Sequence, residues 1–167
     1  MPCNENRRFI LAVTAFITIV TCLTVSCSQS NANTIDDISV EEATALLNQS
    51  IQYASDHNLD GLCGMGGAVA MCQHLFENAG GWDAVPDEAP EIIDSYMLPQ
   101  KDLGNGTYEV GGRILVVKGV DGLGNPYQTD FFVFMNSETG ELAALYPIYW
   151  GNFSIVETDD EGRGVVP

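Results

Sequence analysis

Residues 113–120 read RILVVKGV and residues 127–135 read YQTDFFVFM, and these two stretches decide the fold. Both are rich in β-branched and aromatic residues, and a turn with two glycines lies between them, so each is predicted to be a strand. Successive side chains of a strand alternate between its faces, which puts Ile114 on one face and Leu115 on the other. Both faces are therefore apolar. Helices can cover one face, and the other needs a curled sheet, a tail or a partner.

Two further strands are expected beside this pair. Residues 107–110 are predicted to pair with 113–120 through a two-residue turn at Gly111 and Gly112. Residues 141–149 are predicted to return along 127–135 after the next turn. Together they form a four-stranded antiparallel meander.

The preceding part of the chain is expected to be helical. Ser39, followed three residues later by Glu42, is a capping box, and apolar residues recur at helical spacing up to about His57. A second helix is expected over residues 65–79 and a short third one over 87–97. The predicted class is α+β, with two to three helices packed on the meander.

Composition narrows the possible partners. The chain has 167 residues, enough for one domain, and 46% of them are apolar, as in a folding sequence. It carries 23 acidic residues against six Lys and Arg, a net charge of −17. Nucleic acid and anionic lipid attract clustered cations, so neither is expected to bind by charge. The charge favours a cationic partner or divalent ions, although a solvated acidic surface is the simpler interpretation.

The first residues look like an export signal. Arg7 and Arg8 precede an apolar run over residues 9–25, the pattern of a secretory signal. Residues 23–28, LTVSCS, resemble the lipobox of bacterial lipoproteins, in which Cys27 would be lipidated and become the new N-terminus. The family usually has Leu where this chain has Thr24. Ordinary cleavage after Ala32 is the alternative.

The boundaries follow from these features. Residues 1–27 are the expected signal peptide, 28–38 a polar flexible tether, 39–156 a single α+β domain and 157–167 an acidic tail. The expected location is extracytoplasmic, in a bacterial cell envelope, either on a membrane through the lipid anchor or in the periplasm.

Cys63 and Cys72 are the candidate disulfide, because exported chains meet an oxidising environment. A continuous helix would separate their Cα atoms by roughly 13 Å. A disulfide needs less than about 7 Å. The bond therefore requires the glycine-rich segment around Gly64 and Gly66 to fold back.

A catalytic alternative uses Cys63 as a nucleophile. Residues 61–64 and the helix after them resemble the Cys-bearing helix of transglutaminase-like and papain-like enzymes, which implies a Cys-dependent hydrolase or acyltransferase, or a degenerate relative. Those families place a His on a later strand. Here the sequence has only His57 and His74, so His57 is the candidate base.

Other chemistry has weaker support. His57 and His74 lack partners at zinc-ligand spacing, so no metal site and no cofactor is predicted. Carboxylates gather near Asp87 and near Asp121 without EF-hand spacing, which leaves weak calcium binding or a solvated face. Aromatic residues over 146–150 are expected mainly in the core, with an exposed binding patch as the alternative.

Residues 131–142, FFVFMNSETGEL, resemble the closing hairpin of PepSY-type and cystatin-like domains. The resemblance implies a small extracytoplasmic domain that binds or inhibits proteins. The sequence therefore favours a non-enzymatic binding or inhibitory module for an unidentified protein or small-molecule ligand. A purely structural envelope lipoprotein is the third hypothesis.

Overall fold

The computed structural model describes residues 37–104 and 106–155, all within one compact unit, Asn33–Pro167. The expected signal peptide with Cys27, most of the tether and the acidic tail lie outside the described residues. No helix within the described ranges has both the length and the apolar character needed to span a membrane.

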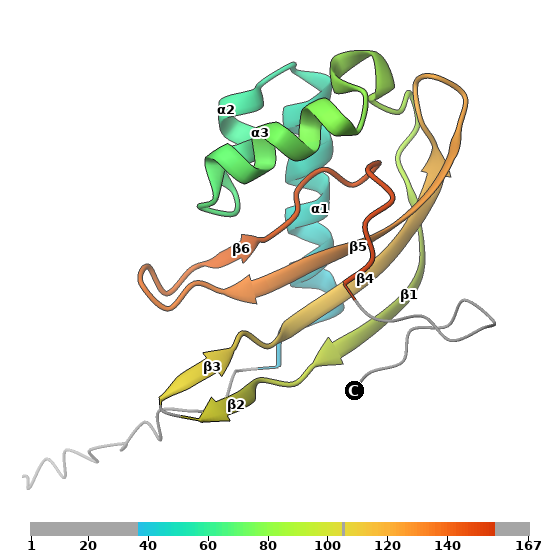
Figure 1. The fold of residues 1–167 in the computed structure, drawn as a ribbon. Helices are drawn as coiled ribbons and strands as arrows, with labels where there is room; N and C mark the ends of the chain where they lie inside the picture. Colours follow the sequence, from blue (N-terminus) through green and yellow to red (C-terminus); the bar gives the residue numbers. More distant parts are fainter. Residues whose placement is uncertain (1–36, 105, 156–167) are drawn as a thin grey trace, which may run out of the picture. The chain divides into compact units, whose positions relative to one another are not determined.

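The described chain has an α+β fold, as predicted. Three α-helices come first: α1 (Val40–Ser55), α2 (Leu59–Gly64) and α3 (Val69–Asn78), followed by a 3₁₀-helix, η1 (Gly81–Ala84). Six strands follow: β1 (Glu91–Leu98), β2 (Lys101–Gly104), β3 (Thr107–Glu109), β4 (Gly112–Val120), β5 (Pro126–Met135) and β6 (Leu142–Ala144). Four form an antiparallel sheet in the order β1-β4-β5-β6, and β2 pairs with β3 in a separate hairpin (Figure 1).

Helix α1 begins where the capping box predicted. The hydroxyl of Ser39 accepts a hydrogen bond from the Glu42 amide at 3.1 Å, and the Glu42 carboxylate accepts one from the Ser39 amide at 2.8 Å. These bonds satisfy amides that a helix start leaves without partners. The Ser39 hydroxyl also donates to the Glu42 carboxylate at 2.7 Å, and this bond, followed by the one from the Ser39 amide, holds the pKa of Glu42 below its usual value.

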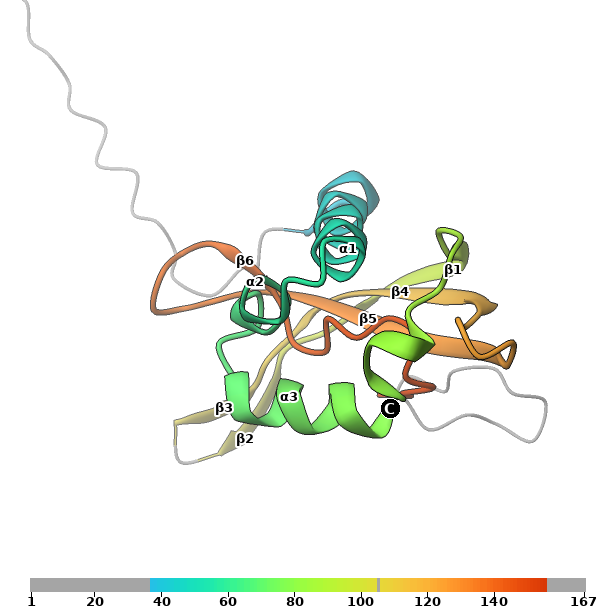
Figure 2. The same cartoon turned by 90° about the horizontal axis from the view of Figure 1, so that it is seen from above.

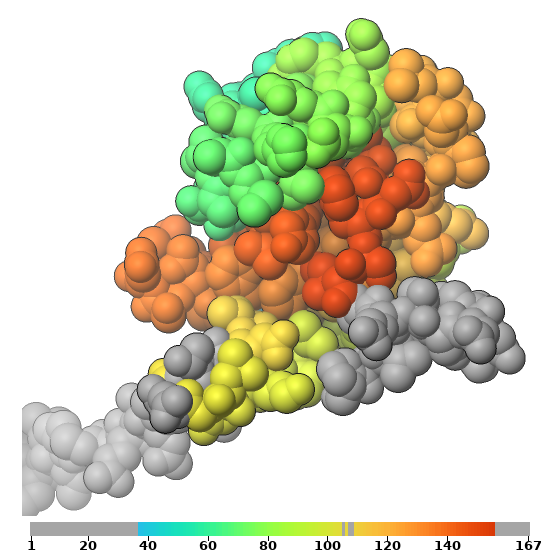
Figure 3. All heavy atoms as spheres, in the orientation of Figure 1, coloured from blue at the N-terminus to red at the C-terminus, as the bar shows by residue number. Residues whose placement is uncertain are grey.

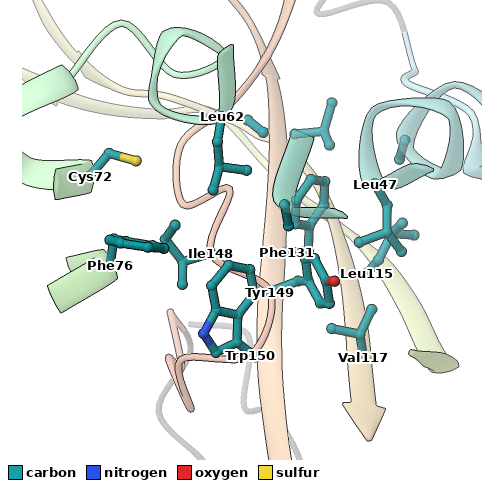
Figure 4. Close-up of a cluster of buried hydrophobic side chains, with 14 of the residues drawn as sticks. Leu47, Leu62, Cys72, Phe76, Leu115, Val117, Phe131, Ile148, Tyr149 and Trp150 are labelled. Atoms are coloured by element: carbon teal, nitrogen blue, oxygen red, sulfur yellow. The ribbon is translucent and has the colours of Figure 1, made fainter. Parts of the chain in front are cut away.

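The main core lies between the helices and one face of the sheet. Leu47 of α1 packs in one cluster with Leu115 and Phe131 of the central strands, and the three are drawn together in Figure 4. Residues 145–155 pass between α3 and β5 and add Tyr149 and Trp150 to this cluster (Figures 1 and 3). Seen from above, α1 and α3 lie on either side of this segment (Figure 2). Burying these large side chains is the main stabilising contribution.

The second face of the sheet carries a smaller apolar cluster. Ile114, Val116 and Phe132 are buried there, with Leu145 and Ile155 among the side chains packed on them. This face was predicted to be apolar, with a tail as one possible cover. The segment after β6 supplies part of that cover.

Asp130 fastens that segment to β5. Its amide donates to the carbonyl of Phe153 at 2.8 Å. Its buried carboxylate accepts from the Ile155 amide at 2.8 Å and from the Ser154 hydroxyl at 3.2 Å. A buried carboxylate with such donors is satisfied, so the chain can bend away from β6 and still stay attached to the sheet.

The helix predicted over residues 87–97 is wrong, because this stretch forms the edge strand β1. Pro90 precedes the strand, and the β-branched Ile92 and Ile93 fit a pleated sheet better than a helix. Pairing decides the outcome, since β1 covers the open edge of β4 from Glu91 opposite Lys118 to Leu98 opposite Gly112.

Three other boundaries differ from the sequence prediction. β3 pairs with β2 and not with β4, so Gly111 and Gly112 do not form a hairpin turn. Gly112 starts β4 instead, where an added Cβ would collide with the Val133 carbonyl and the Phe132 ring. The expected helix over 65–79 starts only at Val69. The expected strand over 141–149 is limited to Leu142–Ala144.

Arg113 ties the start of α1 to the sheet. Its guanidinium donates to the carbonyl of Ile38, to the Ser95 hydroxyl at 3.1 Å and to the Asp37 carboxylate at 3.1 Å. Ile38 is buried in the main core, so the folded part begins before Ser39 and includes the end of the expected tether. The planar, multivalent guanidinium suits this role better than a lysine.

We expect Arg113→Met to lower the free energy of unfolding by about 2 kcal/mol, because it removes three hydrogen bonds of a charged donor. Asp37→Asn is the matched control. The Asp37 side chain is 80% exposed, so its loss should cost less than about 1 kcal/mol. Urea unfolding of residues 33–167 measures both. Equal losses in the two variants would contradict the role given to Arg113.

Candidate functional site

The two candidate cysteines lie at disulfide distance. Their sulfur atoms are 2.05 Å apart and their Cα atoms 5.3 Å apart. The required fold-back occurs, because α2 ends at Gly64 and α3 starts at Val69, with Gly67 at a positive φ of 72° in between. The glycine makes this backbone conformation accessible. The pair joins α2 to α3, and both cysteines belong to the main core.

This geometry gives little support to the alternative in which Cys63 is a catalytic nucleophile. Cys63 and Cys72 are 1% and 4% exposed, and a bonded sulfur offers no thiolate. His57 occupies a left-handed position after α1, at φ 53°, and its exposed ring lies 4.7 Å from that of Trp82. Within the described ranges no hydrogen bond joins His57 to Cys63. The structure therefore does not bring the proposed nucleophile and base together.

His74 lies on an exposed part of α3, where its Nε2 is 3.2 Å from the side-chain amide nitrogen of Asn78. Among residues 37–104 and 106–155, no three His, Cys, Asp or Glu side chains gather closely enough to hold a metal ion. The carboxylates considered for calcium therefore do not form a closed ligand set in the described structure.

An acidic surface groove of about 900 Å³ lies at one end of the sheet. It lies between the segment that enters β1 and the ends of β4 and β5. Its lining residues include the acidic Asp87, Glu88, Glu91 and Asp121, together with Lys118. We call it the acidic groove. Such a volume is typical of small-ligand sites.

Asp121 gives the groove a fixed corner. Its carboxylate accepts hydrogen bonds from the Asn125 amide at 2.7 Å, the Asn125 side chain at 3.1 Å and the Leu123 amide at 3.0 Å. These bonds, the Asn125 amide first, hold the pKa of Asp121 below its usual value. The turn between β4 and β5 is therefore anchored to a carboxylate that stays charged at neutral pH.

The groove's negative charge is only partly neutralised. Lys118 pairs with Glu91 at 3.1 Å, and Arg113 pairs with Asp37 far from the groove along β4. In the described ranges, Asp87 and Glu88 are exposed and form no ion pair. The groove thus presents two unpaired carboxylates beside one that is held charged.

Two buried polar atoms in the described structure lack a hydrogen-bond partner, the hydroxyl of Tyr127 and the indole nitrogen of Trp150. Tyr127 is 4% exposed and Trp150 is 2% exposed. Leaving such a group without a partner costs about 1–3 kcal/mol. Burial, together with the charge of Asp121, raises the pKa of Tyr127 to about 12, so its phenol is neutral.

Sequence reasoning found part of this groove. The sequence predicts two separate acidic clusters, near Asp87 and near Asp121, and the helix predicted over 87–97 gives no reason for them to meet. The aromatic Tyr127 lies in the main core. The aromatic segment 146–150 lies in the core, as expected for most of it, with Ile148, Tyr149 and Trp150 buried.

No protein-family model, no curated protein and no solved structure matches this chain.

Replacing both Cys63 and Cys72 with Ala should lower the free energy of unfolding by about 2–3 kcal/mol, because the bond constrains a short loop of the unfolded chain. Urea unfolding measures the loss, and the same loss is expected when the unaltered chain is reduced. In residues 33–167, which contain only these two cysteines, iodoacetamide should add two groups only after reduction and denaturation. Rapid alkylation of one cysteine in the native, unreduced protein would contradict the pairing and restore the catalytic alternative.

Proposed function

We propose that this chain is an exported, lipid-anchored binding module that does no covalent chemistry and takes a positively charged partner. Cys27 carries the lipid in this proposal, and the folded unit extends from it on the polar tether. The resemblance of residues 131–142 to PepSY-type and cystatin-like hairpins fits a small extracytoplasmic domain that binds or inhibits proteins.

The unbalanced surface charge carries the proposal. Of the three Lys and Arg side chains in the described ranges, Arg113 and Lys118 are engaged with Asp37 and Glu91. Most of the acidic side chains in the described ranges are exposed, and only Asp37 and Glu91 among them form an ion pair there. An acidic surface with a groove raises the local concentration of a cationic partner and speeds its association.

Two further observations support a module without catalysis outside the cytoplasm. The pair Cys63–Cys72 is at disulfide distance, which suits an oxidising compartment. Both histidines are exposed and engaged with Trp82 or Asn78, away from the acidic groove's lining residues. The candidate nucleophile Cys63 therefore lies at disulfide distance from Cys72, and the candidate base His57 packs against Trp82.

The lipid anchor predicts that cells producing the full chain incorporate radioactive palmitate into it, and that Cys27→Ala abolishes the label. Cys22→Ala is the matched control, because Cys22 lies in the same apolar run and should leave labelling intact. Label that survives Cys27→Ala would refute the anchor. A mature N-terminus at Asn33 would show cleavage after Ala32 instead.

The cationic partner predicts saturable binding of a ten-residue oligolysine peptide to residues 33–167. Calorimetry at 0.15 M NaCl should give one peptide per chain. The Kd should rise more than tenfold between 0.05 M and 0.3 M NaCl, because exposed charges are screened. An oligoglutamate peptide should not bind. If oligolysine gives no saturable signal at 0.15 M NaCl, the charge is a solvated surface and the proposed partner is wrong.

A further inference from the structure

We propose that the open edge of β1 binds an extended segment of a basic protein, which joins the four-stranded sheet as a fifth strand through backbone hydrogen bonds. In this segment basic side chains alternate with apolar ones. The inference rests on the proposed function, since it identifies the site and the form of the positively charged partner.

The two edges of the sheet differ. β6 forms one edge with only three residues, and the Ala144 amide there donates to the carbonyl of Met65, in the linker between α2 and α3, at 3.2 Å. The adjoining part of β5 is covered as well, since the Asp130 amide donates to the Phe153 carbonyl at 2.8 Å. β1 forms the other edge with eight residues and pairs only with β4 in the described ranges (Figure 1). Such an edge leaves about every second amide and carbonyl without a strand partner.

The edge is accessible and only lightly protected. Residues 91–94 are exposed, with Ile92 at 37% and Ile93 at 40%. Proteins commonly protect an open edge with lysines, prolines or a bulge. β1 contains neither Lys nor Pro, and its single bulge lies between Ile92 and Asp94. One of its amides, that of Ser95, donates locally to the Asp94 carboxylate at 2.8 Å.

The charges on this edge favour a basic strand over a second copy of the chain. Residues 87–98 carry four carboxylates and no Lys or Arg. Glu91 and Asp94 lie on the second face of the sheet, opposite Lys118 and Val116. Glu91 pairs with Lys118, whereas Asp94 forms no ion pair in the described part of the chain. Two copies joined edge to edge would bring like charges together, but basic side chains at every second position of an added strand would face these carboxylates.

The opposite face of β1 selects apolar side chains. Ile92 and Met97 lie on the main-core face, opposite Val117 and Arg113. Ile92 is exposed and Met97 is half-buried, so both offer apolar surface to a neighbouring strand. A strand that is basic on one face and apolar on the other matches both faces of β1. Backbone hydrogen bonds would then provide affinity, and the alternation of side chains would provide specificity.

The first test compares two ten-residue peptides of the same composition. One repeats Lys-Val five times, and the other has five lysines followed by five valines. Calorimetry with residues 33–167 at 0.15 M NaCl should give a Kd at least about fivefold lower for the alternating peptide, because only this peptide matches both faces of β1. Equal affinity would overturn the proposed alternation.

N-methylation tests the backbone pairing. Successive N–H groups of a strand point to opposite edges, so methyl groups on the five lysines block one edge of the alternating peptide and methyl groups on the five valines block the other. When the lysines face the carboxylates, each strand direction uses a different edge. One methylated peptide should therefore bind at least about tenfold more weakly than the other. Equal affinity of the two would overturn strand addition.

Amide hydrogen exchange locates the site. Saturating ¹⁵N-labelled residues 33–167 with the alternating peptide should slow exchange in β1 at least about tenfold, because added hydrogen bonds protect its amides. The turn over residues 136–141 should be unchanged. Binding that protects other amides and leaves β1 unprotected would overturn the site.

Two double variants remove equal charge from different places. Glu91→Gln with Asp94→Asn should weaken the alternating peptide about tenfold, whereas Glu138→Gln with Glu141→Gln, in the β5–β6 turn, should change its Kd less than about twofold. Similar losses in both would overturn β1 as the site. If oligolysine binds but the alternating peptide leaves β1 unprotected, this inference fails and the proposed function stands. If no cationic peptide binds, both fail.

Discussion

β4 and β5 pair along the whole of β4, and their side chains have to be buried on both faces of the sheet at once. One face takes Leu115 and Phe131 into the main core with the helices. The other needs a separate cover for Ile114 and Phe132. The need to bury both faces explains why the chain after β6 leaves the sheet. It first fills the main core with Tyr149 and Trp150 and then returns along β5, held by the Asp130 carboxylate.

The parts of the fold that could be predicted from the sequence are those that local residue patterns determine. The central strands and the start of α1 depend on local signals, apolar alternation and a capping box, and both are found. β1 could not be identified in this way. Ile92 and Ile93 favour a strand, but Glu91, Asp94 and Ser95 do not, and pairing with the open edge of β4, distant in sequence, decides the outcome. The Cys63–Cys72 pair could be predicted, because an oxidising environment favours a disulfide and the glycine-rich chain between the two cysteines can fold back.

The candidate site was harder to predict because it depends on pairing across strands. Two acidic clusters more than thirty residues apart meet only when 91–98 is a strand and its entry segment lies beside the end of β4. The unpartnered hydroxyl of Tyr127 is visible only once the register places it opposite Gly119. Residue types and spacing cannot show either fact, since both follow from the tertiary arrangement.

A sheet that uses both faces for packing leaves only its edges and ends for binding. At the β4–β5 end, Asp121 fixes the turn through three hydrogen bonds. Strict alternation along β5 turns Tyr127 toward the main core, where its ring packs near Tyr149 but its hydroxyl finds no acceptor or donor. Gly119 faces the same way and lies against that hydroxyl, so the main chain of β4 separates it from Lys118 and Val120, which line the acidic groove on the other face.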